Sequence, residues 1–181
     1  MSKVDKFVLS CFGLFVIGWC AHLMNVTSPI HEIGHLLAAW SEGSGARLTG
    51  WTSTNVEIPS PTIYTAGHYF EGIIYTFLVL VLAKRKIGLA SFIFGLNNNN
   101  LIYGVYSDDF KIAAESVGDG VFKIWSAFNF IILTLGWIVM IMAFRKRAKI
   151  LRASDSGDKC PAPILAATEK TSVANRKEAN T

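Results

Sequence analysis

The sequence His31-Glu32-Ile33-Gly34-His35 places three ionisable residues in a strongly apolar part of the chain. On a helix, histidines four residues apart leave one face about one turn apart. That spacing allows two neutral ring nitrogens to bind one Zn²⁺, and the adjacent glutamate can take a proton from a water at the metal. Two ordinary helix histidines with hydrogen-bonded nitrogens are the alternative interpretation.

The residues around this motif predict a short helix over residues 29–40. Ser28 is a candidate N-cap and Pro29 suits the first helical position, while Leu36 and Leu37 supply apolar surface. A helix of about twelve residues is too short to cross ~30 Å of hydrocarbon alone. Ionisable residues are costly in a membrane and usually functional there, which favours the metal-binding interpretation.

The composition is typical of a membrane protein. The chain has 181 residues, of which 51% are hydrophobic, and its mean hydropathy is +0.39. Its three cysteines suggest neither a disulfide framework nor a zinc ribbon. The net charge of +4 comes largely from clusters that flank apolar segments. We therefore expect the lipid bilayer as a partner, and no nucleic acid.

Four apolar segments predict transmembrane helices, at residues 7–24, 66–83, 87–106 and 121–144. The first is interpreted as a retained helix because no convincing cleavage site precedes the motif. Between the motif and the second segment, residues 41–65 contain short β-like runs at residues 47–49 and 56–58. The expected fold class is mainly α: a polytopic membrane protein with about four transmembrane helices, a short membrane-embedded motif helix and a small re-entrant β-like loop.

Basic clusters at residues 84–86 and 145–149 predict the topology. Both should face the cytoplasm, together with both termini, so residues 27–65 must enter the membrane and return on the same side. Backbone at that depth must line a water-filled cavity or be buried in protein. We expect an N-terminal helix (1–26), a metalloprotease-like core (27–149) and a disordered polar tail (150–181). The expected location is a bacterial inner membrane, because the chain is small and shows no organelle signal.

A catalytic zinc usually has three protein ligands and one open position. The candidates for the third ligand are Asp109, then Asp108, then Asp119. Each has an alternative role as a helix cap, the first two for a short helix over residues 110–116 and Asp119 for the last helix. His22 and His68 are further, lower-ranked nitrogen candidates.

Four consecutive asparagines, residues 97–100, lie inside an apolar segment. Amides facing lipid are costly, so these should face a pocket or pack between helices. Asn99 and Asn100 are candidates for hydrogen bonds to an extended substrate backbone. Alternatively, the four mark the end of a short helix at the membrane interface.

These motifs resemble the site-2 protease family of intramembrane zinc metalloproteases over about residues 27–121. His31-Glu32-x-x-His35 matches the family's zinc motif, and Ala66-Gly67 looks like its Ala-Gly-Pro stretch, with His68 replacing the proline. Residues 100–103 look like Asn-x-x-Pro with Tyr103 in place of proline. In the family this stretch is followed by Leu-Asp-Gly, whereas this chain has Ser-Asp-Asp at residues 107–109. An exact Asp-Gly occurs only later, at residues 119–120.

The resemblance implies a core of three membrane helices carrying Zn²⁺, with His31, His35 and an aspartate as ligands and Glu32 as general base. We therefore expect a zinc metalloendopeptidase acting on membrane protein or peptide substrates, whose extended segments would pair with an edge strand in residues 41–65. Two alternatives stay open. One is a catalytically inactive scaffold of the same fold, and the other is a metal- or solute-handling membrane protein with these polar residues along its pathway.

Overall fold

The structure is a computed structural model that describes residues 1–155, and it is mainly helical, as predicted. In chain order the elements are α1 (Lys3–Leu23), α2 (Ser28–Ser41), β1 (Ala46–Gly50), β2 (Ser53–Val56), α3 (Pro61–Leu82), α4 (Ile87–Tyr103), the 3-10 turn η1 (Gly104–Tyr106), α5 (Asp108–Val117) and α6 (Gly120–Asp155). Each predicted apolar segment is a helix, because its side chains can be buried without breaking backbone hydrogen bonds.

Among residues 1–155, three helices are long and apolar enough to cross a membrane, namely α1, α3 and α6. The sequence predicts about four such helices. The remaining predicted segment, at residues 87–106, contains α4, whose 17 residues span only ~25 Å. The helix is shorter than predicted because the chain tightens into η1 directly after Tyr103.

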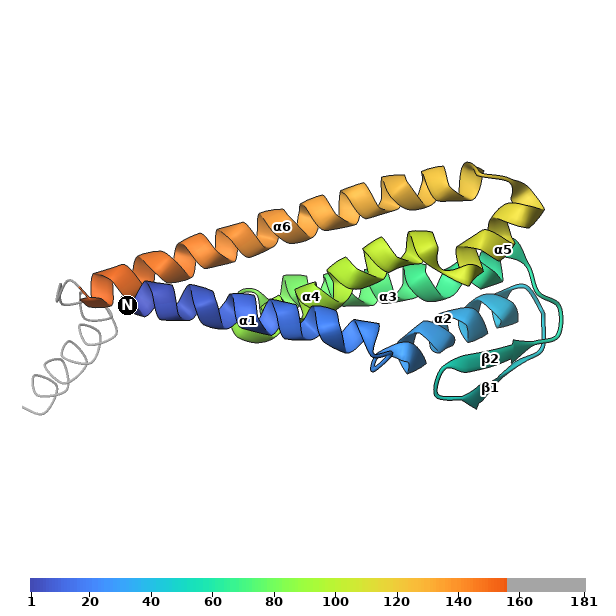
Figure 1. Ribbon diagram of the computed structural model, residues 1–181, viewed down its shortest axis with the longest axis horizontal. Coiled ribbons are helices and arrows are strands. Elements are labelled where there is room, and N and C mark those ends of the chain that lie inside the picture. The colour runs from blue at the N-terminus through green and yellow to red at the C-terminus, as the bar shows by residue number, and fades with distance from the viewer. Residues whose placement is uncertain (156–181) are drawn as a thin grey trace, which may run out of the picture.

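The long helices lie alongside one another, and both the N-terminus and the end of α6 are at one end of the molecule (Figure 1). The turn between α3 and α4, which carries the basic residues 84–86, points toward the same end. Helices α2 and α5 and the β-hairpin lie at the opposite end, where α2 continues away from the N-terminus and the chain turns back at α3 (Figure 1). The position of this end relative to a bilayer stays a prediction.

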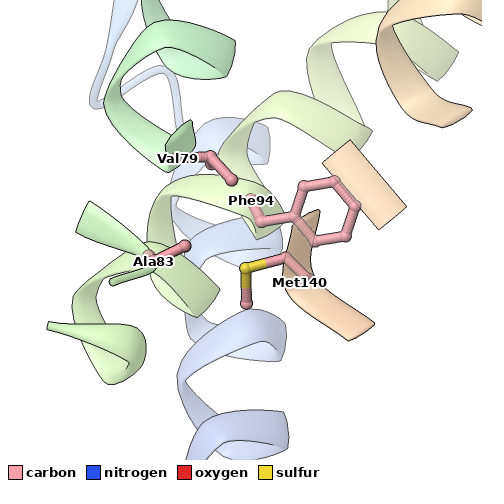
Figure 2. Close-up of a cluster of buried hydrophobic side chains, with 5 residues drawn as sticks. Val79, Ala83, Phe94 and Met140 are labelled. Carbon is pink, nitrogen blue, oxygen red and sulfur yellow. The ribbon is translucent and has the colours of Figure 1, made fainter. Parts of the chain in front are cut away.

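Small residues and an apolar cluster hold the long helices together. A Cβ on Gly18 would collide with the carbonyl of Phe92, so α1 and α4 approach closely through backbone. Further along the bundle, Val79, Phe94 and Met140 bring α3, α4 and α6 into one buried cluster (Figure 2). This packing fixes the helix axes at the end of the molecule away from α2 and α5.

The end of the last helix differs from the sequence prediction. The last helix continues to Asp155 rather than ending near residue 144, so residues 150–155 of the predicted tail are helical. Lysine, arginine and alanine after the apolar stretch are good helix formers and allow the helix to continue into solvent. The rest of the predicted tail, residues 156–181, lies outside the described residues.

The predicted β-like loop is a two-stranded antiparallel hairpin. Its second strand is Ser53–Val56, earlier than the run at residues 56–58 that the sequence suggested. A tight turn at residues 51–52 sets this register, with Arg47 opposite Asn55. Thr54 on β2 donates a side-chain hydrogen bond to the backbone oxygen of Glu32 at 3.4 Å, which ties the hairpin to the motif helix.

Candidate metal centre

Helix α2 presents the motif to α3 across two glycines. A Cβ on Gly34 would lie 2.8 Å from the carbonyl oxygen of Ala66 and from the α-carbon of Gly67. A Cβ on Gly67 would lie 2.6 Å from Nε2 of His31 and 2.7 Å from Nε2 of His35. Side chains at these two positions would therefore separate the helices and push the imidazoles apart.

The start of α2 differs in detail from the prediction. The sequence predicts Ser28 as the N-cap, but Ser28 is the first helical residue, and Thr27 occupies the N-cap position without a side-chain hydrogen bond. Pro29 lies in the first turn, as expected for a residue that lacks a backbone N–H. This shift does not alter the relative positions of His31 and His35, which depend only on the helical repeat.

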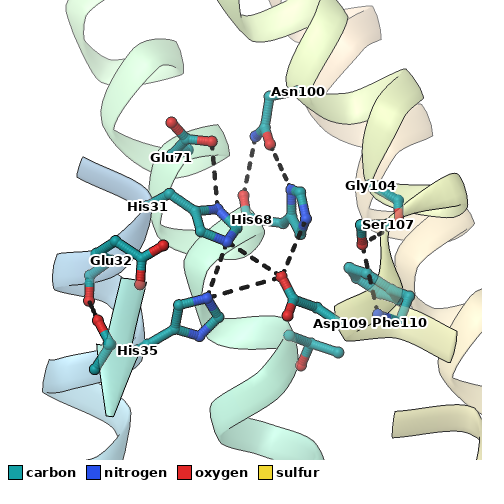
Figure 3. Close-up of polar contacts among 12 residues, drawn as sticks. His31, Glu32, His35, His68, Glu71, Asn100, Gly104, Ser107, Asp109 and Phe110 are labelled. Carbon is teal, nitrogen blue, oxygen red and sulfur yellow. Dashed lines mark hydrogen bonds and ion pairs between the residues drawn. The ribbon is translucent and has the colours of Figure 1, made fainter. Parts of the chain in front are cut away.

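Three predicted ligands converge on one point (Figure 3). Nε2 of His31 lies 2.9 Å from Nε2 of His35 and 3.2 Å from Oδ2 of Asp109. Nε2 of His35 lies 3.8 Å from the same carboxylate oxygen. Asp109 reaches the histidines from the first turn of α5, so this short helix completes the group.

The other two aspartate candidates are not brought to the histidines. Asp108 lines the pocket, but its exposed carboxylate binds Nζ of Lys111 at 2.8 Å. Asp119 is exposed just before α6. The cap of α5 is Ser107, whose side-chain oxygen accepts from the backbone N–H of Phe110. Asp109 is therefore left free of a capping role.

A hydrogen bond orients the imidazole of His35, and a charged contact orients that of His31. Nδ1 of His35 lies 2.6 Å from the carbonyl oxygen of Ile63, which can only accept, so this nitrogen carries the proton. Nδ1 of His31 lies 3.6 Å from the carboxylate of Glu71. In the neutral imidazoles, each Nε2 then presents a lone pair toward the other and toward Asp109. Partners of this kind are typical of the outer shell of a metal site.

Two lone pairs and a carboxylate at these distances repel one another unless a cation lies among them. A proton bound to His31 can supply this positive charge. His31 lies on α2, outside the three helices that could span a membrane. Burial lowers the pKa of this imidazole, but hydrogen bonds and charge from Asp109 and Glu71 outweigh it and raise the pKa to about 9. Burial likewise raises the pKa of the Asp109 carboxyl, but the histidines outweigh it and lower the pKa. The nitrogen and oxygen donors also fit Zn²⁺.

Glu32 lies beside the converging nitrogens. Its carboxylate is within 4.8 Å of the ring nitrogens of His31 and His35, and the residue is buried. Together with Asp109 and with Thr52 of the hairpin turn, it lines a pocket of about 340 Å³. A buried carboxylate that faces both a candidate metal position and open space has the geometry of a general base.

The structure also brings in two residues of α3: His68, a lower-ranked candidate from the sequence, and Glu71, which no sequence motif singles out. Nε2 of His68 lies 3.7 Å from Oδ2 of Asp109. Glu71 is 1% exposed and faces Nε2 of His22 at 3.4 Å, in addition to His31. The spacing of three between His68 and Glu71, which puts two ionisable residues on one face of an apolar helix, is a signal that could have identified them.

The asparagines are buried between the helices. Asn99 contacts Nδ1 of His22 at 3.0 Å. Asn100 donates to the backbone oxygen of His68 at 3.0 Å, and its Oδ1 lies 2.8 Å from Nδ1 of that residue. The amides of Asn99 and Asn100 thus contact histidines of the polar cluster, and their predicted contact with substrate stays a prediction.

Comparison with models of known protein families, with curated proteins and with solved structures finds no match. The resemblance to site-2 proteases therefore rests on the motifs in the sequence. The geometry around His31, His35 and Asp109 is independent of that resemblance, because it follows from how α2, α3 and α5 pack.

Proposed function

We propose that this chain is a membrane-embedded zinc metallopeptidase that hydrolyses peptide bonds of membrane-associated substrates. The observation that carries the proposal is the convergence of His31, His35 and Asp109 beside the buried carboxylate of Glu32. Two nitrogens and one carboxylate oxygen are a common ligand set of catalytic zinc sites. The apolar helices α1, α3 and α6 support a membrane location for this chemistry.

In this mechanism, His31, His35 and Asp109 would hold the metal through Nε2, Nε2 and Oδ2. Bound Zn²⁺ would supply a Lewis acid that polarises the peptide carbonyl and makes water nucleophilic near neutral pH. Glu32 takes the proton of the attacking water and passes it to the leaving amine. The carbonyl of Ile63 holds the imidazole of His35, and the carboxylate of Glu71 holds that of His31, so both lone pairs stay directed at the site.

The hairpin offers a place for an extended substrate. The backbone N–H of Glu57 donates to the carbonyl of Gly45 at 2.9 Å, so this pair is a hydrogen-bonded pair of the ladder. By the alternation of antiparallel strands, Thr54 and Val56 then direct their N–H and C=O groups away from β1. The free edge of β2, next to the motif helix, can pair with an unwound substrate segment and guide it into the pocket.

The finer topology forms part of the proposal. We place the basic ends of the helices in the cytoplasm, with both termini there, following the positive-inside rule, and the chain in a bacterial inner membrane. Helix α4 is an interior element that contacts α1, α3 and α6. Its shorter length is compatible with a membrane setting because its neighbours, rather than lipid, cover most of it.

The test combines zinc content with turnover in purified protein. We expect one zinc per chain in the wild type and in Glu32→Gln, and loss of zinc in His35→Ala. Turnover of a library of quenched fluorescent peptides derived from transmembrane segments should fall about 10²–10⁴-fold in Glu32→Gln, because the general base is lost. Glu42→Gln, an exposed glutamate at the end of α2, is the matched control.

Three other results would contradict the proposed function. Absence of zinc from wild type purified without chelator would refute the metal site. Stoichiometric zinc without turnover of any peptide would favour an inactive scaffold. Transport of metal or solute that survives Glu32→Gln would favour a pathway protein, because transport does not need a general base.

A further inference from the structure

We propose that His68 is a fourth protein ligand of the metal, so that the centre consists of three imidazoles and one carboxylate. The inference rests on the proposed metal site and extends it. His68 stands where the resembled family has proline, which cannot bind a metal through its side chain. A ligand at this position would therefore be particular to this chain.

The position of His68 relative to the other donors is the first observation. Its side chain is buried, and its Nε2 lies 3.7 Å from the same Asp109 oxygen that His31 contacts. His31, His68 and Asp109 each direct a ligand atom to within 4.8 Å of the others. The ring of His31 packs edge-on against both other imidazoles, with its centroid 4.6 Å from that of His35 and 4.4 Å from that of His68.

The orientation of the His68 ring is the second observation. The amide nitrogen of Asn100 donates to the backbone oxygen of His68, so the amide oxygen must face Nδ1 of the ring. Nδ1 therefore carries the proton, and Nε2 of the neutral ring presents a lone pair toward Asp109. At 3.7 Å this contact is too long for a hydrogen bond, so the lone pair of Nε2 is not taken up by Asp109.

Asn100 is 0% exposed and is held in place by α4, so the imidazole is fixed in this orientation. The arrangement matches the other two histidines, where Ile63 and Glu71 act on Nδ1. Three imidazoles with occupied Nδ1 atoms thus direct three Nε2 atoms at one carboxylate, which is how outer partners prepare histidines for a metal.

Four protein ligands would complete a tetrahedron. Asp109 and His68 approach from the side of α5 and α3, whereas Glu32 lies beside His31 and His35. Water or a substrate carbonyl would then have to reach the metal as a further ligand, and the resting centre would be more closed than one with three protein ligands.

The chain has four histidines in total, so each imidazole can be observed separately. We would label the full chain with ¹⁵N-histidine, load it with ¹¹³Cd²⁺ as a spectroscopic substitute for zinc, and record one-bond ¹¹³Cd–¹⁵N couplings at Nε2. His68→Gln and His22→Gln assign the resonances. His22 is the internal control because its two nitrogens face Glu71 and Asn99.

We expect three coupled Nε2 resonances, of which His68→Gln removes one and His22→Gln removes none. Two coupled resonances, from His31 and His35 alone, would overturn the inference and leave the proposed metal site intact. No coupling and no bound cadmium would overturn both. The wild-type count needs no variant, so a folding defect in His68→Gln cannot obscure it.

Zinc affinity gives a second readout. Loss of an outer hydrogen-bond partner of a ligand typically costs about 10–100-fold in affinity. We expect Asn100→Ala to fall within that range and His68→Gln to exceed about 100-fold, measured by competition with a chelator. Wild-type affinity in His68→Gln would overturn the inference.

Discussion

Oδ2 of Asp109 lies 3.2 Å from Nε2 of His31, although 78 positions separate the two residues along the chain. The neighbouring Asp108 instead pairs with Lys111 at the surface. The contact depends on the position of α5, which packs against α3 and directly follows η1. This position directs one of the two adjacent carboxylates into the site.

This contact predicts different effects of two matched substitutions. Asp109→Asn should lower zinc affinity by more than about 100-fold, beyond the loss typical of an outer-shell partner, because a neutral amide replaces the carboxylate ligand. Asp108→Asn should leave the affinity within about twofold, since its carboxylate faces Lys111 and solvent. Chelator competition on both purified variants is the measurement. Equal losses in the two variants, or no loss in either, would contradict the assignment.

Gly67 predicts a steric effect on the same site. In Gly67→Ala the new Cβ would lie 2.6 Å from Nε2 of His31, so α2 and α3 must move apart or the imidazoles must turn. We expect a loss of zinc affinity of at least about 10-fold, comparable to a disturbed ligand orientation. Gly13→Ala is the control, because a Cβ there meets nothing within 4 Å. Unchanged zinc affinity in Gly67→Ala would show that the helices are less closely packed than described.

Zinc affinity should depend on pH. Without metal, Asp109 and Glu71 hold the pKa of His31 at about 9, against the effect of burial. Below that pH, zinc must displace a proton, so the apparent affinity should fall by up to about 10-fold for each unit of decreasing pH. Competition titrations at pH 6, 7 and 8 would measure the slope. Affinity that is constant across this range would mean that His31 binds no proton in the free protein.

The hairpin edge predicts a selective effect on turnover. Val56→Pro removes an N–H that points away from β1, so the hairpin should survive while pairing with an extended substrate is lost. We expect peptide turnover to fall about 10-fold, which corresponds to the net contribution of one backbone hydrogen bond, with zinc content unchanged. The matched control is Ala46→Pro, since Ala46 is the cross-strand partner of Val56 and lies on the opposite edge. Normal turnover in Val56→Pro would exclude this edge as the docking strand.

Much of this arrangement can be predicted from local sequence. The helical repeat alone places His31 and His35 on one face, and the apolar runs locate the helices, except that the last one continues to Asp155. Both depend only on backbone geometry and on the cost of exposing polar groups to lipid. Local sequence did not predict the start of α2 correctly, because Ser28 is the first helical residue and not the N-cap. It also placed β2 too late in the chain, because the position of this strand depends on a tight turn.

The composition of the metal centre required tertiary structure. Asp108 and Asp109 are both candidate ligands in the sequence, and only the packing of α5 directs Asp109 toward the histidines. His68 is one histidine in an apolar helix until Gly34 and Gly67 allow α3 to approach α2, and until Asn100 from α4 fixes its ring. The sequence by itself therefore determined the motif and the helices, which follow from contacts within a few residues. Only the tertiary structure decided which distant side chains complete the site, because that depends on the rotation and separation of packed helices.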